Sequence, residues 1–197
     1  MFVNYLAALI FGYALGSIPF GLIFTRLAGH GDVRDIGSGN IGATNVLRTG
    51  NKWLAAATLL ADMGKGALVI FIVGYFLKEV PLALIFAGAG AFLGHIFPIW
   101  LKFKGGKGVA VYIGIMLALN PMTGAMMILT WLFFAYALRI SSLAALSMAA
   151  AAPFFIFIFG DIPLILLALF ISSLIFYKHW ANIKRLMDGS EPKIGEK

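Results

Sequence analysis

The chain alternates long apolar segments with short polar connections along almost its whole length. A helix that crosses the hydrocarbon core of a bilayer needs about 20 mostly apolar residues. Seven segments are candidates for such helices: 3–25, 53–77, 81–101, 108–120, 121–138, 141–159 and 161–178. The segment 108–120 is short for a full crossing, and Asn120-Pro121 separates it from the next one, so five or six crossings remain alternatives. The pattern predicts an all-α integral membrane protein with about seven transmembrane helices.

The composition supports this reading. Apolar residues make up 61% of the chain and charged residues 12%, whereas a soluble domain is about 45–50% apolar and about 25% charged. A soluble fold must cover itself with polar surface, so the composition excludes a water-soluble enzyme. The absence of cysteine excludes disulfides, thiolate metal ligands and a cysteine nucleophile. No basic residue precedes the first apolar segment, and we therefore expect no cleaved signal peptide.

The basic residues are unevenly distributed between the connections. The chain has 15 Lys and Arg against 8 Asp and Glu, and with seven crossings 13 of the 15 basic residues fall on one side. The positive-inside rule makes that side cytoplasmic, with the N-terminus outside and the C-terminus in the cytoplasm. No linker divides the sequence. We therefore expect a single polytopic membrane domain over residues 1–197, with three cytoplasmic motif loops at about 26–52, 101–108 and 178–197.

The first of these loops contains the run GSGNIGATNVLR at 37–48. Closely spaced glycines let backbone N–H groups converge on an anion, and a helix that starts after them would aim its positive end at the same point. Arginine can hold a phosphate or carboxylate through two hydrogen bonds. The candidate ligands are Gly37, Ser38, Gly39, Asn40, Gly42, Thr44, Asn45 and Arg48. A flexible linker is the alternative interpretation.

The other two loops also carry candidate chemistry. The second contains Lys104, Gly105, Gly106, Lys107 and Gly108, a composition that suits a phosphate. It is not a Walker A loop, because no Ser or Thr follows the lysine and no strand precedes it. A contact with anionic lipid is the alternative.

The third loop contains His179 and Asn182, which share a face if the segment is helical. Arg185 and Glu191 follow them, and Trp180 has the character of an interfacial anchor.

Ionisable residues also occur inside the apolar segments. Asp62 and Lys65 are three residues apart, and each would cost about 2.5–3.5 kcal/mol at the bilayer centre, so we expect them to pair or to face a polar cavity. His95 is interpreted as a hydrogen-bonding residue rather than a base. His30 and Asp35 show the H-x4-D spacing of a different acyltransferase class, but without its supporting context, and we set this match aside.

Three motifs, in order and spacing, resemble the bacterial acyl-phosphate:glycerol-3-phosphate acyltransferase family (PlsY). They are GSGNIGATNVLR at 37–48, GHIFPIWLKFKGGKGVA at 94–110 and HWANIKRLMDGSEPK at 179–193, and the stretch DMGKG at 62–66 agrees as well. One departure is Val111, where many members have threonine. The resemblance implies transfer of a fatty acyl group from acyl phosphate to the sn-1 hydroxyl of glycerol 3-phosphate. The products are lysophosphatidic acid and phosphate, and the reaction is the first step of phospholipid synthesis.

The resemblance also implies roles for residues. Ser38 and Arg48 would be essential, the loop 104–108 would bind glycerol 3-phosphate, and His179 and Asn182 would act at the reaction centre. Glu191 would be structural. Besides its two substrates and membrane lipids the family implies no metal, coenzyme A, acyl-carrier protein, nucleic acid or obligate protein partner. The expected location is the bacterial cytoplasmic (inner) membrane, with the active site on or near the cytoplasmic face.

The chemistry agrees with these residue types. Acyl phosphate is a mixed anhydride with a good leaving group, so the protein mainly has to hold two anions together and present the hydroxyl to the carbonyl. Either His179 or a substrate phosphate oxygen can take the hydroxyl proton. Direct transfer is favoured, and an acyl-enzyme on Ser38 is the alternative. A transporter of a phosphorylated metabolite is the rival function, although the outer face has little charge and no inverted repeat is visible.

Overall fold

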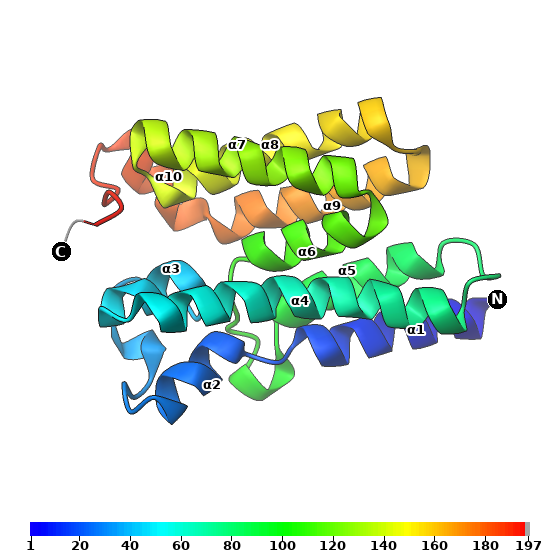
Figure 1. Cartoon of the computed structure of the whole chain (residues 1–197), viewed down its shortest axis with the longest axis horizontal. Helices are drawn as coiled ribbons and strands as arrows, with labels where there is room; N and C mark the ends of the chain where they lie inside the picture. The colour runs from blue at the N-terminus through cyan, green and yellow to red at the C-terminus, as the bar shows by residue number, and fades with distance from the viewer. Residues whose placement is uncertain (196–197) are drawn as a thin grey trace. The chain divides into compact units, whose positions relative to one another are not determined.

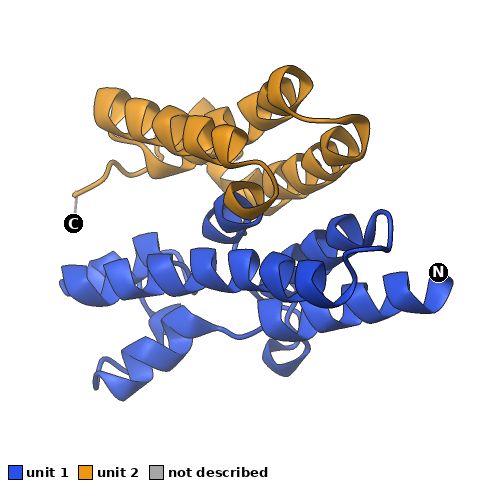
Figure 2. Cartoon of the chain, turned by 45° about the vertical axis from the view of Figure 1, so that its right-hand side comes forward, with its two compact units in different colours: residues 1–115 blue, residues 116–197 orange. Residues whose placement is uncertain are grey.

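The computed structural model describes residues 1–195, and every regular element in that range is a helix (Figure 1). Contacts within the chain gather into two compact units, Met1–Ile115 and Met116–Lys197 (Figure 2). The boundary between the units falls inside an apolar helix, where composition changes little, and the single membrane domain over residues 1–197 stays a prediction.

Unit 1 contains the N-terminal helices and most of the polar connections. Its elements are α1 (Phe2–Gly16), α2 (Phe20–Leu27), η1 (Val33–Asp35), α3 (Ala43–Val46), η2 (Leu47–Thr49), α4 (Lys52–Phe76), α5 (Ala83–Ile96) and η3 (Ile99–Leu101). The short helix α6 (Val109–Leu119) leads into unit 2, whose helices are α7 (Pro121–Leu138), α8 (Ser141–Phe159), α9 (Ile162–Lys178) and α10 (Trp180–Met187). Each of the seven predicted apolar segments contains one or two of these helices, which confirms the all-α fold.

Helix length and composition give five or six candidate membrane crossings. Within the described residues, five helical segments are long and apolar enough to cross, and a sixth is obtained if α9 and α10, bent by 61°, form one span. Helix α6 has 11 residues, which at 1.5 Å per residue extend about 16 Å, or roughly half of the hydrocarbon core. The predicted seven crossings, and the orientation that depends on them, therefore stay predictions.

The first apolar segment is broken where the sequence predicted a continuous helix. Pro19 has no N–H and disfavours a helical conformation at the residue before it, so α1 ends and α2 begins around this residue. The break displaces two carbonyl groups from the helical ladder. The Trp100 indole Nε1 donates to the Ser17 carbonyl at 2.8 Å, and the Lys65 ammonium donates to the Ile18 carbonyl at 2.7 Å. These bonds provide both carbonyls with a hydrogen-bond donor, which lipid hydrocarbon cannot supply.

Helix α1 packs closely on α5 because both present small residues to each other. A Cβ atom added at Gly16 would overlap the backbone of Ala91, and one added at Gly94 would overlap the backbone around Tyr13. Small residues at such a contact allow the helix backbones to approach closely, which is the usual device for packing membrane helices. Both α1 and α5 also pack against α4.

The connection between α2 and α4 is a folded segment with its own small core. Leu22 of α2, Val33 of η1, Ile41, Val46 of α3 and Ala55 of α4 are buried against one another. Burial of apolar side chains on both sides of the glycine-rich run fixes its path. This packing contradicts the alternative interpretation of the segment as a flexible linker.

In unit 2, polar contacts join neighbouring helices and attach the C-terminal segment to them. Ser172 Oγ of α9 donates to the Ala149 carbonyl of α8 at 2.7 Å, which joins these neighbouring helices. The C-terminal segment returns to the turn between α7 and α8, where the Ile194 N–H donates to the Arg139 carbonyl at 2.6 Å. The Arg139 guanidinium donates back to the Ile194 carbonyl at 3.2 Å. The C-terminal segment is therefore fastened to the end of unit 2 that also carries α10.

Candidate functional site

The glycine-rich loop of unit 1 is organised around the side chain of Asn45, which is only 2% exposed. Its amide Nδ2 donates towards the carbonyls of Val33 (2.8 Å), Ile36 (3.1 Å) and Asn40 (2.8 Å). Its Oδ1 accepts from the Ser38 backbone N–H at 3.0 Å and lies 3.3 Å from Ser38 Oγ. The amide has only two hydrogens, so these partners use all of its donor capacity.

Arg48 lies beside the same group of atoms. Its Nη1 is 3.5 Å from Asn45 Oδ1, and a Cβ atom added at Gly37 would overlap the guanidinium. Gly37 has φ +53°, a left-handed conformation that favours glycine, so this position requires the residue for both reasons. The loop thus brings together Gly37 and Ser38 from the turn after η1, Asn45 from α3 and Arg48 from η2.

Two details of the predicted anion nest differ in the structure. The N–H groups of Ser38, Gly39 and Gly42 bond within the loop, to Asn45 Oδ1, the Ile36 carbonyl and Asn40 Oδ1. A helix does start after Gly42, but α3 has only four residues. One helical turn carries little of the aligned dipole that a longer helix presents at its N-terminus. The side chains of the loop are therefore better placed than its backbone to receive an anion.

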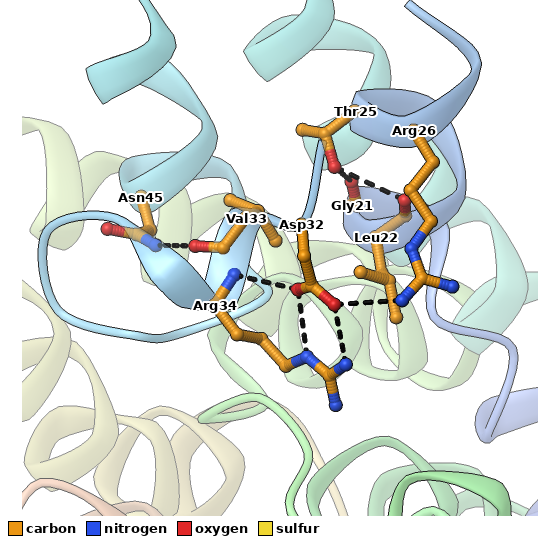
Figure 3. A network of polar contacts seen from close by, with 8 residues as sticks. All are labelled: Gly21, Leu22, Thr25, Arg26, Asp32, Val33, Arg34 and Asn45. Atoms are coloured by element: carbon orange, nitrogen blue, oxygen red, sulfur yellow. Dashed lines mark hydrogen bonds and ion pairs between the residues drawn. The ribbon is translucent and has the colours of Figure 1, made fainter. Parts of the chain in front are cut away.

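Three arginines in this region differ in their partners. Arg26 and Arg34 both donate to the carboxylate of Asp32, at 2.8 Å and 2.6 Å (Figure 3). The Arg34 guanidinium, with help from Arg26, holds the pKa of Asp32 well below its usual range. Arg48 is exposed, and within residues 1–195 no carboxylate pairs with it. Of these three arginines, Arg48 is the one whose charge remains available to an anionic ligand.

The second loop folds back along the end of α5. The N–H of Gly106 donates to the His95 carbonyl at 3.1 Å, and the N–H of Gly105 donates to the Ile96 carbonyl at 3.3 Å. A Cβ atom at Gly106 would overlap the His95 ring. Lys104 is exposed and, within the described residues, has no carboxylate partner. The loop therefore presents a lysine from a tightly held turn.

The remaining members of this motif are more enclosed. Lys107 is half-buried and Gly108, with φ +85°, is buried against Phe92. Val111, the departure from the family pattern, is fully buried in α6, so its side chain packs in the core.

The intramembrane ion pair predicted from the sequence is present. Lys65 Nζ lies 2.7 Å from Asp62 Oδ1 and 2.9 Å from His95 Nδ1, and all three side chains are less than 5% exposed. His95 is a hydrogen-bonding partner, as predicted. The sequence did not reveal the additional bond from Lys65 to the Ile18 carbonyl.

The polar cluster of unit 2 centres on Glu191. Its carboxylate accepts from Ser142 Oγ, Asn182 Nδ2 and Arg185 Nε, each at 2.6 Å. Burial raises the pKa of Glu191, but these three donors outweigh it and leave the pKa below its ordinary value. The bonds join the start of α8, helix α10 and the C-terminal segment. Ser142 was missed by sequence reasoning, because nothing local to it indicates a partner 49 residues away.

His179 stands at the bend between α9 and α10 rather than inside one helix. Its carbonyl accepts from the Ile183 N–H at 2.9 Å, so it begins α10, in which Asn182 also lies. Both side chains are buried. His179 Nδ1 lies 2.8 Å from the Ile175 carbonyl. A carbonyl can only accept, so Nδ1 carries the hydrogen, and in the neutral ring Nε2 holds the lone pair.

The chain matches a protein-family model described as glycerol-3-phosphate acyltransferase over residues 6–189, which include parts of both units. A glycerol-3-phosphate acyltransferase of Methylorubrum populi is 56% identical over 192 residues, covering 98% of this chain and 94% of that protein. One of Bradyrhizobium diazoefficiens is 56% identical over 190 residues, covering 96% and 95%.

Two solved structures resemble the fold. Both are crystal structures of PlsY (YgiH), an integral membrane glycerol 3-phosphate acyltransferase, and both are 36% identical to this chain. The glycerol 3-phosphate form has a TM-score of 0.90 and covers 97% of this chain and 96% of its own. The lysophosphatidic acid form has a TM-score of 0.87, with coverage of 97% and 95%.

Proposed function

The chain belongs to the glycerol-3-phosphate acyltransferase family, and from that premise we propose that acyl phosphate is its acyl donor. The acyl group passes to the sn-1 hydroxyl of glycerol 3-phosphate and gives lysophosphatidic acid and inorganic phosphate. The observation that carries the proposal is the close match to PlsY, which was crystallised in glycerol 3-phosphate and lysophosphatidic acid forms. The three motifs that resemble the acyl-phosphate-dependent family, with the DMGKG stretch, suggest the donor. The family match removes the reason for the transporter hypothesis.

The positive charges of unit 1 support binding of phosphorylated substrates. Arg48 and Lys104 lack carboxylate partners within the described residues and project from the two glycine-containing loops. We assign Arg48 and Ser38 to a substrate phosphate and the loop 104–108 to glycerol 3-phosphate. Arginine suits the first role because it can bind a phosphate through two parallel hydrogen bonds, whereas lysine acts as a point charge.

Asn45 has a different role in this proposal from the ligand predicted from the motif. Its amide hydrogens are directed at carbonyls of the loop and its oxygen accepts from Ser38. We assign it to the shape of the loop, with Ser38 and Arg48 left to contact the substrate.

The proposed reaction is a single displacement at the acyl carbonyl carbon. The sn-1 oxygen of glycerol 3-phosphate bonds to this carbon, the bond between the carbon and the phosphate oxygen breaks, and phosphate leaves. Cationic groups stabilise the negative charge that develops on the carbonyl oxygen and on the leaving phosphate. Because the donor is already activated, no covalent intermediate on Ser38 is needed, and holding the two substrates together supplies most of the catalysis.

The proton of the attacking hydroxyl goes either to His179 or to an oxygen of the substrate phosphate. The hydrogen bond from Nδ1 to the Ile175 carbonyl supports the first route, since it leaves the lone pair of a neutral ring on Nε2. Asn182 is held by Glu191, so we assign it to the placement of α10 around His179.

An apolar groove in unit 2 is a candidate for the acyl chain. It has a volume of about 470 Å³ and is lined by residues of α8, α9 and α10, among them Leu146, Ala150, Phe176, Ile183 and Met187. This volume is within the range of roughly 300–1,000 Å³ that is usual for ligand clefts. Helix α10 contributes to both the groove and the polar cluster around Glu191, which would bring an acyl chain close to the polar residues of that cluster.

An assay with purified protein tests the donor. Radiolabelled glycerol 3-phosphate is incubated with palmitoyl phosphate, palmitoyl-coenzyme A or palmitoyl-acyl-carrier protein, and lysophosphatidic acid and phosphate are measured. We expect equal amounts of both products from palmitoyl phosphate and none from either thioester. Product from a thioester but not from palmitoyl phosphate would overturn the proposal.

Matched variants test the phosphate site in the same assay. Arg48→Gln removes the guanidinium, which has no carboxylate partner within the described residues, and we expect kcat/KM to fall by about 100-fold, the loss of a charged hydrogen-bonding pair with the substrate. Arg26→Gln is the control, because Arg26 is exposed in the same loop region, 26–52, but pairs with Asp32. We expect its kcat/KM to stay within about threefold of the parent. Equal effects of the two substitutions would contradict the role of Arg48.

The absence of cysteine allows a clean test of the proposed cytoplasmic face. Ser190→Cys marks the C-terminal segment, and Lys78→Cys marks the connection between α4 and α5; both positions are exposed. In intact cells a membrane-impermeant maleimide should label only the cysteine at position 78, and permeabilised cells should show both. The reverse pattern would contradict the orientation.

A further inference from the structure

The buried ammonium of Lys65 contacts three different elements of unit 1. It forms the ion pair with Asp62 in its own helix, donates to the Ile18 carbonyl at the α1–α2 break, and approaches Nδ1 of His95 in α5. The Phe20 ring lies against it, with 5.6 Å between Nζ and the ring centroid. The ammonium therefore makes one ion pair and two hydrogen-bonding contacts.

We propose that Lys65 is a positioning residue for glycerol 3-phosphate, which sets the two phosphate-binding loops of unit 1 in place without touching substrate. This inference rests on the proposed function for the identity of the ligand. It depends on two chains of contacts that start from the same nitrogen.

The first chain of contacts leads to the glycine-rich loop. The bond from Lys65 to the Ile18 carbonyl fixes the break after which α2 begins. Gly21 of α2 then packs directly on the backbone of Ile41, since a Cβ atom at Gly21 would overlap the Ile41 carbonyl. Leu22, one residue on, is buried in the small core that also holds Ile41. A shift of α2 at the break would therefore be transmitted to the loop that carries Ser38.

The second chain of contacts leads to the lysine loop. Lys65 approaches His95 Nδ1, and the other edge of that ring lies against Gly106, where a Cβ atom would overlap Nε2. The His95 carbonyl accepts from the Gly106 N–H. Because His95 contacts Gly106 through both its side chain and its backbone, a change in how Lys65 holds that side chain would shift the loop. Lys104 stands two residues before Gly106 and moves with it.

Charge neutralisation alone does not explain this arrangement. A buried ion pair can often be replaced by apolar residues of similar volume with no loss of stability. Leucine and methionine at positions 62 and 65 would fill the space, but neither can donate to the Ile18 carbonyl or to His95 Nδ1. The double replacement therefore removes the donor to both groups without leaving an unpaired charge in the interior.

The test uses Asp62→Leu/Lys65→Met in the full-length protein. The control is Lys78→Met/Glu79→Leu, which removes an exposed ion pair from the connection between α4 and α5. The measurements are Tm in detergent, kcat, and the KM values for glycerol 3-phosphate and palmitoyl phosphate. We expect the buried double variant to fold with a lower Tm, because the Ile18 carbonyl and His95 Nδ1 lose their donor, and to show a KM for glycerol 3-phosphate raised by about tenfold or more. The control should match the parent in every measurement. An unchanged KM in a folded double variant would overturn the proposal.

A pair of His95 variants keeps the inference testable if the double variant does not fold. His95→Gln retains an oxygen that can accept from Lys65, whereas His95→Phe retains only the ring. We expect His95→Gln to keep the KM for glycerol 3-phosphate within about threefold of the parent and His95→Phe to raise it by about tenfold. The same KM for both variants would overturn the proposal.

A binding measurement separates this inference from the proposed function. The Kd of glycerol 3-phosphate is measured by calorimetry without any acyl donor. If the parent binds glycerol 3-phosphate but transfers no acyl group from palmitoyl phosphate, the proposed donor is wrong. The role of Lys65 is still supported in that case if the Kd is raised about tenfold in His95→Phe but not in His95→Gln. If Kd is the same in the parent and both variants, the positioning role is wrong.

Discussion

Replacing Asn45 with alanine should disable the glycine-rich loop without unfolding the protein. The structure allows an estimate of the loss. Asn45 makes three well-formed hydrogen bonds at a time: its amide donates two, and its Oδ1 accepts one from the Ser38 N–H. At about 1 kcal/mol net each, these contribute about 3 kcal/mol. The Val33 carbonyl is buried, and leaving it without a partner adds about 1 kcal/mol or more.

This local loss should appear in catalysis. Water can reach the exposed residues Gly37–Gly39 and recovers part of the energy, so we take about 3 kcal/mol as the cost of ordering the loop in the variant. If the loop is ordered for only a fraction of the time, the apparent Kd of its ligand equals the intrinsic Kd divided by that fraction. Since 1.36 kcal/mol corresponds to a factor of ten, kcat/KM should fall by about 100-fold, mostly through KM.

The assay is steady-state acyl transfer with glycerol 3-phosphate varied at saturating donor, together with Tm in detergent. Asn51→Ala is the control, because Asn51 also accepts a single backbone hydrogen bond, from the Leu54 N–H at 3.0 Å, as the N-cap of α4. It should lose about 1 kcal/mol of stability and keep its KM. If Asn45→Ala folds and its kcat/KM stays within about threefold of the parent, the assignment of Asn45 as the organiser of the loop is refuted.

Three further outcomes follow from the geometry. Gly37→Ala should raise the KM for glycerol 3-phosphate by about tenfold, because the added Cβ displaces the Arg48 guanidinium. Gly29→Ala is the control: Gly29 also has a positive φ but lies in open space, so its KM should not change. Similar KM values for the two variants would contradict this prediction. His179→Ala should lower kcat by about 100-fold or more at constant KM if its ring is the base, and a kcat near that of the parent would assign the proton to the substrate phosphate. The depressed pKa of Glu191 predicts that its carboxylate stabilises the fold above the ordinary pKa of about 4.3 and that this stability is lost as pH falls through the lower pKa of the folded state. The Tm of Glu191→Gln should therefore lie below that of the parent at pH 7 and approach it under acid conditions, and a constant difference down to pH 3 would contradict the ion pair with Arg185.

The helices could be predicted from the sequence because their signals are local. Asn120 and Pro121 stand at the start of α7 as N-cap and first residue, and Asp161 caps α9 in the same way. Apolar length and these caps are read within a few residues of each helix end. The Asp62–Lys65 pair was also accessible, since residues three apart on a helix are neighbours.

The tertiary structure decided which polar groups hold the fold and which remain for a ligand. Asn45 and Arg48 are three residues apart in one motif, yet the first is buried among loop carbonyls and the second is exposed without a carboxylate partner in the described chain. Lys65 reaches a carbonyl 47 residues away, at a helix break that the hydropathy pattern does not show. Such roles depend on contacts between distant segments, and composition and spacing do not encode which of many compatible partners a side chain meets. The sequence by itself therefore determined the helices, the membrane setting and the types of chemical group available. Only packing decided which of those groups form hydrogen bonds with backbone carbonyls, for which a bilayer offers no partner.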